Sequence, residues 1–220
     1  AMLKSAATVS LYDQPNTPSK LDFTLQVTST TGHKLPSSYP SRRVFLHVVV
    51  KNSQGKIVFE SGKMRPDGSI VEVASDNNPG KFEPHYDLIT LPGQVQVYEA
   101  IMGDSSGAVT YTLLRGAKYL KDNRILPTGF DKQTAPSDIR AVGAAWDANF
   151  VGGSDNVRYS VSGLPDGKYS VRAELVYQTL AHGFAKDLFS DTVTQEVVEF
   201  KAMYDAMTEK ATVIADVEFT

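Results

Sequence analysis

The sequence contains no cysteine among its 220 residues. This absence excludes disulfide bonds, thiolate metal ligands, a cysteine nucleophile and the covalent attachment of a c-type haem within the chain. No apolar run approaches the roughly 18–20 residues that a membrane-spanning helix needs. The N-terminus also lacks the apolar stretch of a signal peptide, so we expect the chain to begin at a processing boundary.

Positive charge is scarce and dispersed. The chain has 22 Lys and Arg against 25 Asp and Glu, a formal net charge of −3 and a pI near 5.8. Its longest basic run is the pair Arg42-Arg43. A protein that binds nucleic acid or a membrane surface needs a basic patch to neutralise phosphates. The charge pattern therefore argues against both kinds of partner.

What the sequence does contain is a series of short segments in which apolar and polar residues alternate. This period of two is typical of strands with one buried face. Links rich in Asn, Gly and Pro separate the segments and predict turns. The clearest predicted strands are residues 21–28, 44–50, 94–102, 168–177 and 212–219, and weaker ones are 7–12, 56–60, 69–74, 108–114, 140–145 and 156–161.

Apolar spacing changes late in the chain. Over residues 178–208 the apolar positions fall three to four apart, which predicts a helical insert. Many short strands with a single helical region favour a mainly β fold. We therefore predict one domain over residues 1–220, an antiparallel β-sandwich of jelly-roll or Ig-like type, with an extended lead-in over residues 1–20.

Several separate motifs occur in a familiar order between residues 31 and 204. They are TGHKLPSSYPSRR, FESG, EPHYD, QVQVYEAIMGDSSG, LLRGAKYLKDNRILPTGF, ANFVGGSD and LVYQTL. Together they resemble the non-haem C-terminal region of periplasmic multihaem c-type cytochromes. The CxxCH haem-attachment motifs of that family are missing here. The resemblance therefore implies a periplasmic β-domain whose haem c groups lie in an upstream region of the same polypeptide, and it also allows a redox partner protein.

His33, in the motif TGHKLP, is the haem-ligand candidate. The resemblance implies that its imidazole reaches a haem of the neighbouring region as a distal axial ligand, a role that neutral histidine fills. The alternative is a histidine that binds backbone groups in a proline-stiffened loop. Arg42, Arg43 and Arg124 are candidates for contacts with haem propionates or a partner, because guanidinium binds carboxylates in a bidentate manner. The alternative for them is an ion-pair network between strands.

Two loops carry possible metal ligands. Asp147, Asn149 and Asp155 lie in an oxygen-rich, glycine-bent loop, and calcium prefers such oxygens. His85 has a carboxylate two residues away on each side, which makes it a weaker metal candidate. The alternatives are an ordinary turn for the first loop, since Asx and Gly residues also build turns, and a structural histidine for the second.

No catalytic motif stands out. The sequence has no G-x-S-x-G nucleophile elbow, no HExxH zinc motif, no P-loop and no dinucleotide-binding fingerprint. We therefore predict that the chain is not an enzyme. The resemblance implies an accessory domain that packs on or ligates a haem region and supports electron transfer. The alternative is a calcium-dependent carbohydrate- or surface-binding β-sandwich module.

Overall fold

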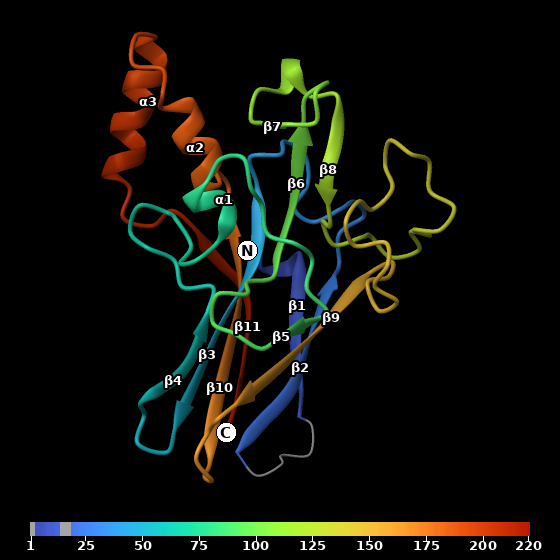
Figure 1. The fold of residues 1–220 in the computed structure, drawn as a ribbon, viewed down its shortest axis with the longest axis vertical. Helices are drawn as coiled ribbons and strands as arrows, with labels where there is room; N and C mark the ends of the chain where they lie inside the picture. Colours follow the sequence, from blue (N-terminus) through green and yellow to red (C-terminus); the bar gives the residue numbers. More distant parts are fainter. Residues whose placement is uncertain (1–2, 14–18) are drawn as a thin grey trace.

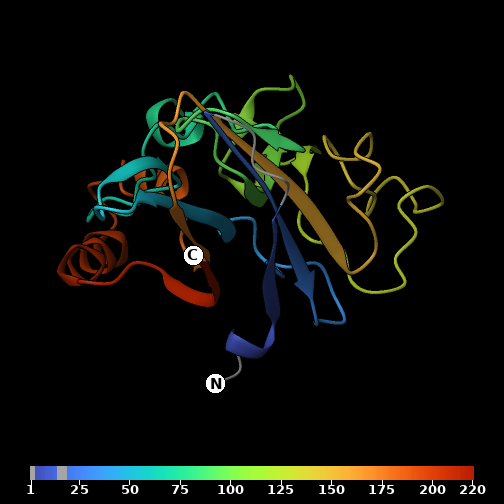
Figure 2. The same ribbon diagram turned by 90° about the horizontal axis from the view of Figure 1, so that it is seen from below.

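The computed structural model describes residues 3–13 and 19–220, whose strands form two sheets (Figures 1 and 2). The first sheet has the order β1 (Ala7–Asp13), β2 (Lys20–Ser29), β9 (Ser154–Ser162) and β5 (Leu88–Ile89). The second has the order β11 (Thr212–Phe219), β10 (Tyr169–Gln178), β3 (Arg43–Asn52), β6 (Val97–Gly103) and β7 (Val109–Thr110). In that sheet β4 (Ile57–Ser61) also pairs with β3, and β8 (Lys118–Asp122) pairs with β6. The prediction of a mainly β sandwich is confirmed.

One pair of strands departs from the expected antiparallel arrangement. β5 runs parallel to β9, with Leu88 opposite Arg158 and Ile89 opposite Tyr159. The strands that precede and follow β5 in the chain, β4 and β6, belong to the other sheet. The chain between β5 and its parallel partner β9 therefore crosses to the other sheet, where it forms β6, β7 and β8, before it returns. Such a crossover connection permits parallel pairing, whereas a tight hairpin does not.

The main core lies between the two sheets. Alternate residues of β2 and β3 face it, as the period of two predicts, and Phe23 stacks on Tyr159 of β9 with 5.0 Å between ring centroids. Burying each such side chain stabilises the fold by about 1.5–3 kcal/mol relative to leaving it exposed. The residues from these two strands are Leu21, Phe23, Leu25, Val27, Val44, Leu46, Val48 and Val50.

The other face of β3 is also covered near its start. Phe45 packs there with Ile70, Val73, Val95 and Val97 in a second cluster of buried residues. Burial on both faces explains why this part of β3 reads as an unbroken apolar run in the sequence.

Helices are few among the described residues. They are α1 (Ala74–Asn77), α2 (His182–Leu188) and α3 (Gln195–Ala206), with 3₁₀ turns at Leu3–Ser5 and Leu113–Arg115. α2 and α3 confirm the helical insert expected over residues 178–208. None of the described helices is long and apolar enough to cross a membrane.

Some expected strands do not form. Residues 69–74 and 140–145 make isolated bridges at most, and only Val109–Thr110 of the segment 108–114 is a strand. The backbone N–H of Ile70 donates to the Asp76 carboxylate instead of to a neighbouring strand. Conversely, β8 was not expected, because its buried residues Lys121 and Asp122 are charged and hide the apolar alternation.

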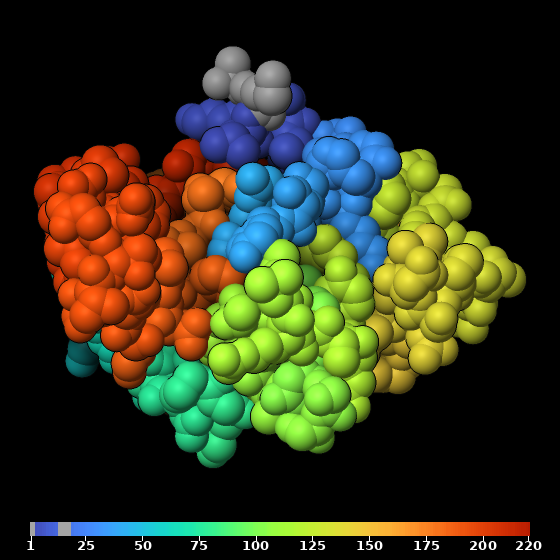
Figure 3. Space-filling view, turned by 90° about the horizontal axis from the view of Figure 1, so that it is seen from above, coloured from blue at the N-terminus to red at the C-terminus, as the bar shows by residue number. Residues whose placement is uncertain are grey.

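The loops at one end of the sandwich gather the segments that carry the candidate sites. Seen from above, residues 30–42 (light blue) lie between the helices α2 and α3 (orange) and the loops of residues 127–150 (yellow), beside the hairpin of residues 104–117 (lime) (Figure 3). This face, which we call the loop end, joins segments that are far apart in the sequence.

Gly62, which follows β4, provides a test of the packing. Its φ is +80°, and a Cβ there would lie 2.1 Å from the backbone oxygen of Leu46. We expect Gly62→Ala to lower the free energy of unfolding by about 2–3 kcal/mol, because it adds a clash with backbone to the cost of a left-handed conformation. Gly55→Ala is the matched control, since Gly55 has a φ of +77° but open space around it. It should cost only about 1 kcal/mol; equal losses in urea denaturation would contradict the role of the contact.

Candidate functional site

His33 is exposed at the loop end. Its Nδ1 lies 3.2 Å from the carbonyl oxygen of Lys34, and a carbonyl only accepts hydrogen bonds. Nδ1 therefore carries the ring proton and donates it, while Nε2 keeps its lone pair. Nε2 has no partner among the described residues. An Nδ1–H held by a carbonyl with Nε2 open is the arrangement that metal-ligating histidines use.

A cavity of about 310 Å³ opens beside His33. Phe130 and Ile139 supply apolar walls, and Lys34 and Arg124 supply positive charge. Both cations are anchored by the fully buried Asp122: Lys34 Nζ lies 2.7 Å from Oδ2, and Arg124 binds both carboxylate oxygens at 2.8 Å. Burial lowers the pKa of Lys34 although Asp122 opposes this shift. The structure thus brings the predicted residues His33 and Arg124 to one cavity.

The neighbouring arginines have different surroundings. Arg42 is partly exposed and donates from Nη1 to the carbonyl of Ser37 at 3.1 Å. Arg43 is fully buried: Nη1 and Nη2 each bind a carboxylate oxygen of Asp76 at 2.8 Å, and Nε donates to Gln178 at 2.7 Å. The surface offers no part of Arg43 to a propionate or a partner. For Arg43 the structure shows the alternative considered from the sequence, an internal ion pair.

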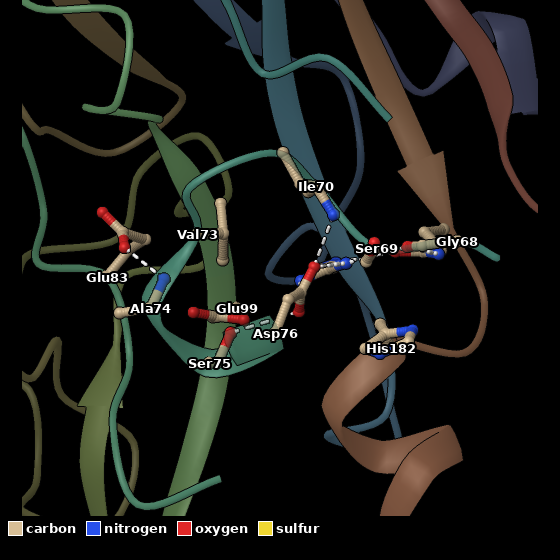
Figure 4. A network of polar contacts seen from close by, with 12 residues as sticks. Gly68, Ser69, Ile70, Val73, Ala74, Ser75, Asp76, Glu83, Glu99 and His182 are labelled. Carbon is tan, nitrogen blue, oxygen red and sulfur yellow. Dashed lines mark hydrogen bonds and ion pairs between the residues drawn. The ribbon is translucent and has the colours of Figure 1, made fainter. Parts of the chain in front are cut away.

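This ion pair belongs to a wider buried polar network (Figure 4). Asp76 also accepts the backbone N–H of Ile70 at 2.6 Å. Glu83 accepts the N–H of Ala74 at 2.6 Å, and Glu99 binds the buried ammonium of Lys121 at 3.0 Å. Desolvation lowers the pKa of Lys121. Each of these buried charges has a partner: Arg43 and Asp76 tie the segment around α1 to strand β3, and Lys121 and Glu99 tie β8 to β6.

A second polar cluster surrounds His85, which is buried. Its Nε2 lies 3.1 Å from Asp147 Oδ2 and 3.8 Å from Asp155 Oδ1. Ligand atoms of the three residues lie within 4.8 Å of one another, so the fold joins residues that the sequence placed at two different predicted metal sites. Asn149 is not part of this cluster, because its amide donates to Asp87 at 2.8 Å and accepts the N–H of Asn156 at 2.9 Å.

The hydrogen bonds around His85 decide which ring nitrogen carries the proton. The amide oxygens of Gln96 and Asn123 each accept a backbone N–H, at 2.9 and 3.0 Å, which fixes the orientation of both amides. Their NH₂ groups therefore face His85 Nδ1, at 2.8 and 3.2 Å. Nδ1 accepts, and Nε2–H donates to Asp147. A metal ion on Nε2 would need the proton on Nδ1, against two N–H donors, so this arrangement opposes metal ligation by His85.

Asp155 completes the cluster. Its Oδ2 accepts from the Tyr98 hydroxyl at 2.7 Å and from Gln96 at 3.2 Å, whereas its buried Oδ1 has no hydrogen-bond partner among the described residues. Burial raises the pKa of Asp155 to about 7 and lowers the pKa of His85 to about 4. The cluster can therefore hold one proton on Asp155 near neutral pH while the imidazole stays neutral.

Three residues of this cluster were not predicted as site residues from the sequence: Gln96, Tyr98 and Asn123. The alternation over residues 94–102 placed Val95 and Val97 on one face, and Gln96 and Tyr98 share the other. Two hydrogen-bonding side chains on one face of a strand with apolar flanks were an available signal. Asn123 had none, because its partners lie in distant parts of the chain.

The fold and these clusters define a two-sheet, mainly β domain with a helical insert and with ion pairs buried in its interior. No protein-family model matches the sequence, and no curated protein matches it either. Among solved structures, the chain is similar to part of a crystal structure of a penta-haem cytochrome c552 from Thermochromatium tepidum, with a TM-score of 0.55 and 14% sequence identity. The match covers 99% of this chain and 40% of that cytochrome. A likeness at this identity concerns the fold.

Proposed function

We propose that this chain is a non-catalytic accessory domain of a multihaem c-type cytochrome in the periplasm, where it packs against the haem-bearing region and supports electron transfer. The observation that carries the proposal is the fold match, which takes in 99% of this chain but 40% of a penta-haem cytochrome. A chain without cysteine holds no covalent c-type haem. The haems that it serves are therefore attached elsewhere.

The loop end is the face that suits this role. It exposes His33 Nε2 beside the cavity with Arg124, and it also exposes large apolar side chains: Leu114 is 99% exposed and Tyr39 44%. Lys34 and Arg124 together carry one more charge than their shared partner Asp122, which favours a haem propionate, whereas the carboxylate of Asp138 on the same cavity opposes it.

The proposal is tested on the product of the complete natural gene, made in a host that matures c-type cytochromes. We expect a polypeptide longer than this chain that carries covalent haem, measured by mass spectrometry and by the pyridine haemochrome spectrum. A complete natural product without haem, which also binds no cytochrome of its own organism, would overturn the proposal.

In that protein, His33→Ala should remove the low-spin signal of one haem, because the imidazole would no longer supply an axial ligand. Electron paramagnetic resonance and the visible spectrum report the change. His182→Ala is the control, since His182 lies in α2 and its Nδ1 is 3.5 Å from a backbone carbonyl. If the spectra of His33→Ala and of the unaltered protein coincide, His33 is not a haem ligand and only the packing role remains.

A further inference from the structure

His47 lies in the middle of β3, on the face of the second sheet that points away from the main core. Its neighbours Leu46 and Val48 point into that core. Both ring nitrogens of His47 lie close to carboxylates: Nδ1 is 3.0 Å from Glu174 Oε2 on β10, and Nε2 is 3.2 Å from Glu60 Oε1 on β4. The imidazole therefore joins the strands on the two sides of β3 (Figure 1).

These two contacts determine how many protons the ring carries. An ionised carboxylate only accepts hydrogen bonds, so each contact needs an N–H group on the imidazole. Two N–H groups are present only in the imidazolium ion. A neutral ring keeps one contact and turns the lone pair of its other nitrogen towards a carboxylate oxygen. The geometry around His47 therefore fits the protonated ring, unlike that around His85, whose Nδ1 accepts from two amides.

Both glutamates have a second positive partner. Glu60 binds Lys63 at 3.1 Å, and Glu174 binds Arg172 at 2.8 Å. Although burial opposes the shift, hydrogen bonds from these partners and from His47 lower the pKa of both carboxylates. The carboxylates therefore stay ionised over the pH range in which an imidazole changes charge.

β11 adds two carboxylates to this face of the sheet. Asp216 lies opposite Glu174 and Glu218 lies opposite Arg172, and both are exposed. Among the side chains described so far, the protonated ring gives three positive groups against four carboxylates, and the neutral ring leaves two against four. Loss of the proton from His47 therefore leaves the repulsion between carboxylates less compensated.

The two strands beside His47 are held with unequal strength. β10 pairs with β3 over the whole of Arg43–Asn52 and with β11 on its other edge. β4 pairs with β3 only over residues 48–51, where the register is irregular, and it pairs with no other strand in the described part of the chain. Phe59 is buried and holds the middle of β4 to the core. A change of charge at His47 should therefore loosen β4 locally and leave β10 in place.

We propose that His47 is a pH-dependent switch that controls how firmly the edge strand β4 is held: the protonated ring binds both Glu60 and Glu174, and loss of the Nε2 proton releases Glu60. The neutral ring keeps the shorter contact, from Nδ1–H to Glu174. Histidine is the side chain that ordinarily changes charge between pH 5 and 8, so the switch operates near neutral pH. It lies on a strand face away from the cavity at His33 and does not depend on haem.

Amide hydrogen exchange of the full chain at pH 5 and pH 8.5, corrected for the pH dependence of the exchange reaction itself, measures the release of β4. We expect the protection of Ile57–Ser61 to fall by roughly threefold to fivefold at the higher pH, which is the effect of one partly exposed ion pair. The protection of Tyr169–Gln178 should not change. Nitrogen NMR of the His47 ring should show protons on both nitrogens at pH 5 and on Nδ1 alone at pH 8.5.

Variants link the effect to the ring. His47→Gln removes the titrating group and should abolish the pH dependence of protection in β4. His182→Gln makes the same change at a histidine in α2 and should behave like the unaltered chain. Protection of β4 that is equal at the two pH values in the unaltered chain, or a pH dependence that survives His47→Gln, would overturn the proposal. A proton lost from Nδ1 would overturn it as well, and this ring spectrum decides even if His47→Gln does not fold.

Discussion

Replacing Asp76 with alanine should lower the free energy of unfolding by about 3–5 kcal/mol. Among the described residues, Asp76 supplies the one carboxylate that binds the guanidinium of Arg43, and the side chains of both residues are 1% exposed. The remaining bonds of Arg43, to Gln178 and to the carbonyl of Gly68, do not neutralise its charge. The N–H of Ile70 also loses its acceptor. An unpaired charge in a dry interior is therefore the dominant cost.

Urea denaturation of matched variants separates this cost from lost packing. The double variant Arg43→Met/Asp76→Leu should recover much of the stability, because it removes both buried charges together. Lys20→Ala breaks the more exposed Lys20–Asp22 pair, at 2.9 Å, and should change stability by no more than about 1 kcal/mol. A double variant as unstable as Asp76→Ala would show that shape, and not charge, explains the loss.

Substitutions at Asp155 and His85 should change the pH dependence of stability in opposite directions. The pKa of Asp155 is raised from its ordinary value of 3.8 to about 7, first through burial. The contribution of Asp155 to the free energy of unfolding is therefore fully present below pH 3.8, where the group is protonated in both states. It is lost as pH rises through 7, where the buried carboxylate must ionise. The pKa of His85 is lowered from 6.5 to about 4, again through burial. Its contribution is present above pH 6.5 and is lost as pH falls through 4.

The two contributions oppose each other between about pH 4 and pH 6.5. The shift of Asp155 corresponds to on the order of 4 kcal/mol and that of His85 to on the order of 3 kcal/mol. Relative to the unaltered chain, Asp155→Asn should gain stability as pH rises from 4 to 8, because asparagine stays neutral and still accepts from Tyr98. His85→Gln should instead lose stability over the same range.

Equilibrium unfolding at several pH values between 4 and 8 gives both differences directly. Subtracting the unaltered chain removes the contributions of other titrating groups, such as Glu60, Asp67 and Glu174, whose pKa values are lowered. Tyr98→Phe is a useful companion, since it removes the hydroxyl that binds Asp155 Oδ2 without changing charge. Curves for the variants that run parallel to that of the unaltered chain would contradict the assigned protonation states.

Much of the fold could be predicted because alternation is a local property. Residues 212–219 form a strand with the expected bounds, and β2, β3 and β10 lie within one or two residues of prediction. Prediction failed where side-chain chemistry at long range overrode the local pattern. Residues 69–74 alternate like a strand but turn around Asp76, whereas β8 pairs with β6 although Lys121 and Asp122 hide its pattern.

The candidate sites were less predictable, because they depend on contacts between distant segments. His85 and Asp147 are 62 residues apart in the chain and 3.1 Å apart in space. Their separate prediction as metal candidates followed residue type, and residue type does not reveal which nitrogen of an imidazole is protonated. Arg42 and Arg43 look alike in the sequence, yet one is partly exposed and the other buried.

By itself, the sequence determined that the chain is mainly β and that without cysteine it attaches no c-type haem, and its dispersed charge predicts neither a nucleic-acid nor a membrane-surface partner. Only the tertiary structure decided the roles of its histidines. His33 donates Nδ1–H to the carbonyl of the next residue and leaves Nε2 open, whereas amides from distant strands hold His85 with Nε2 protonated. The physical reason is that hydrogen-bond partners select the tautomer, and the partners of His85 come together only in the folded chain.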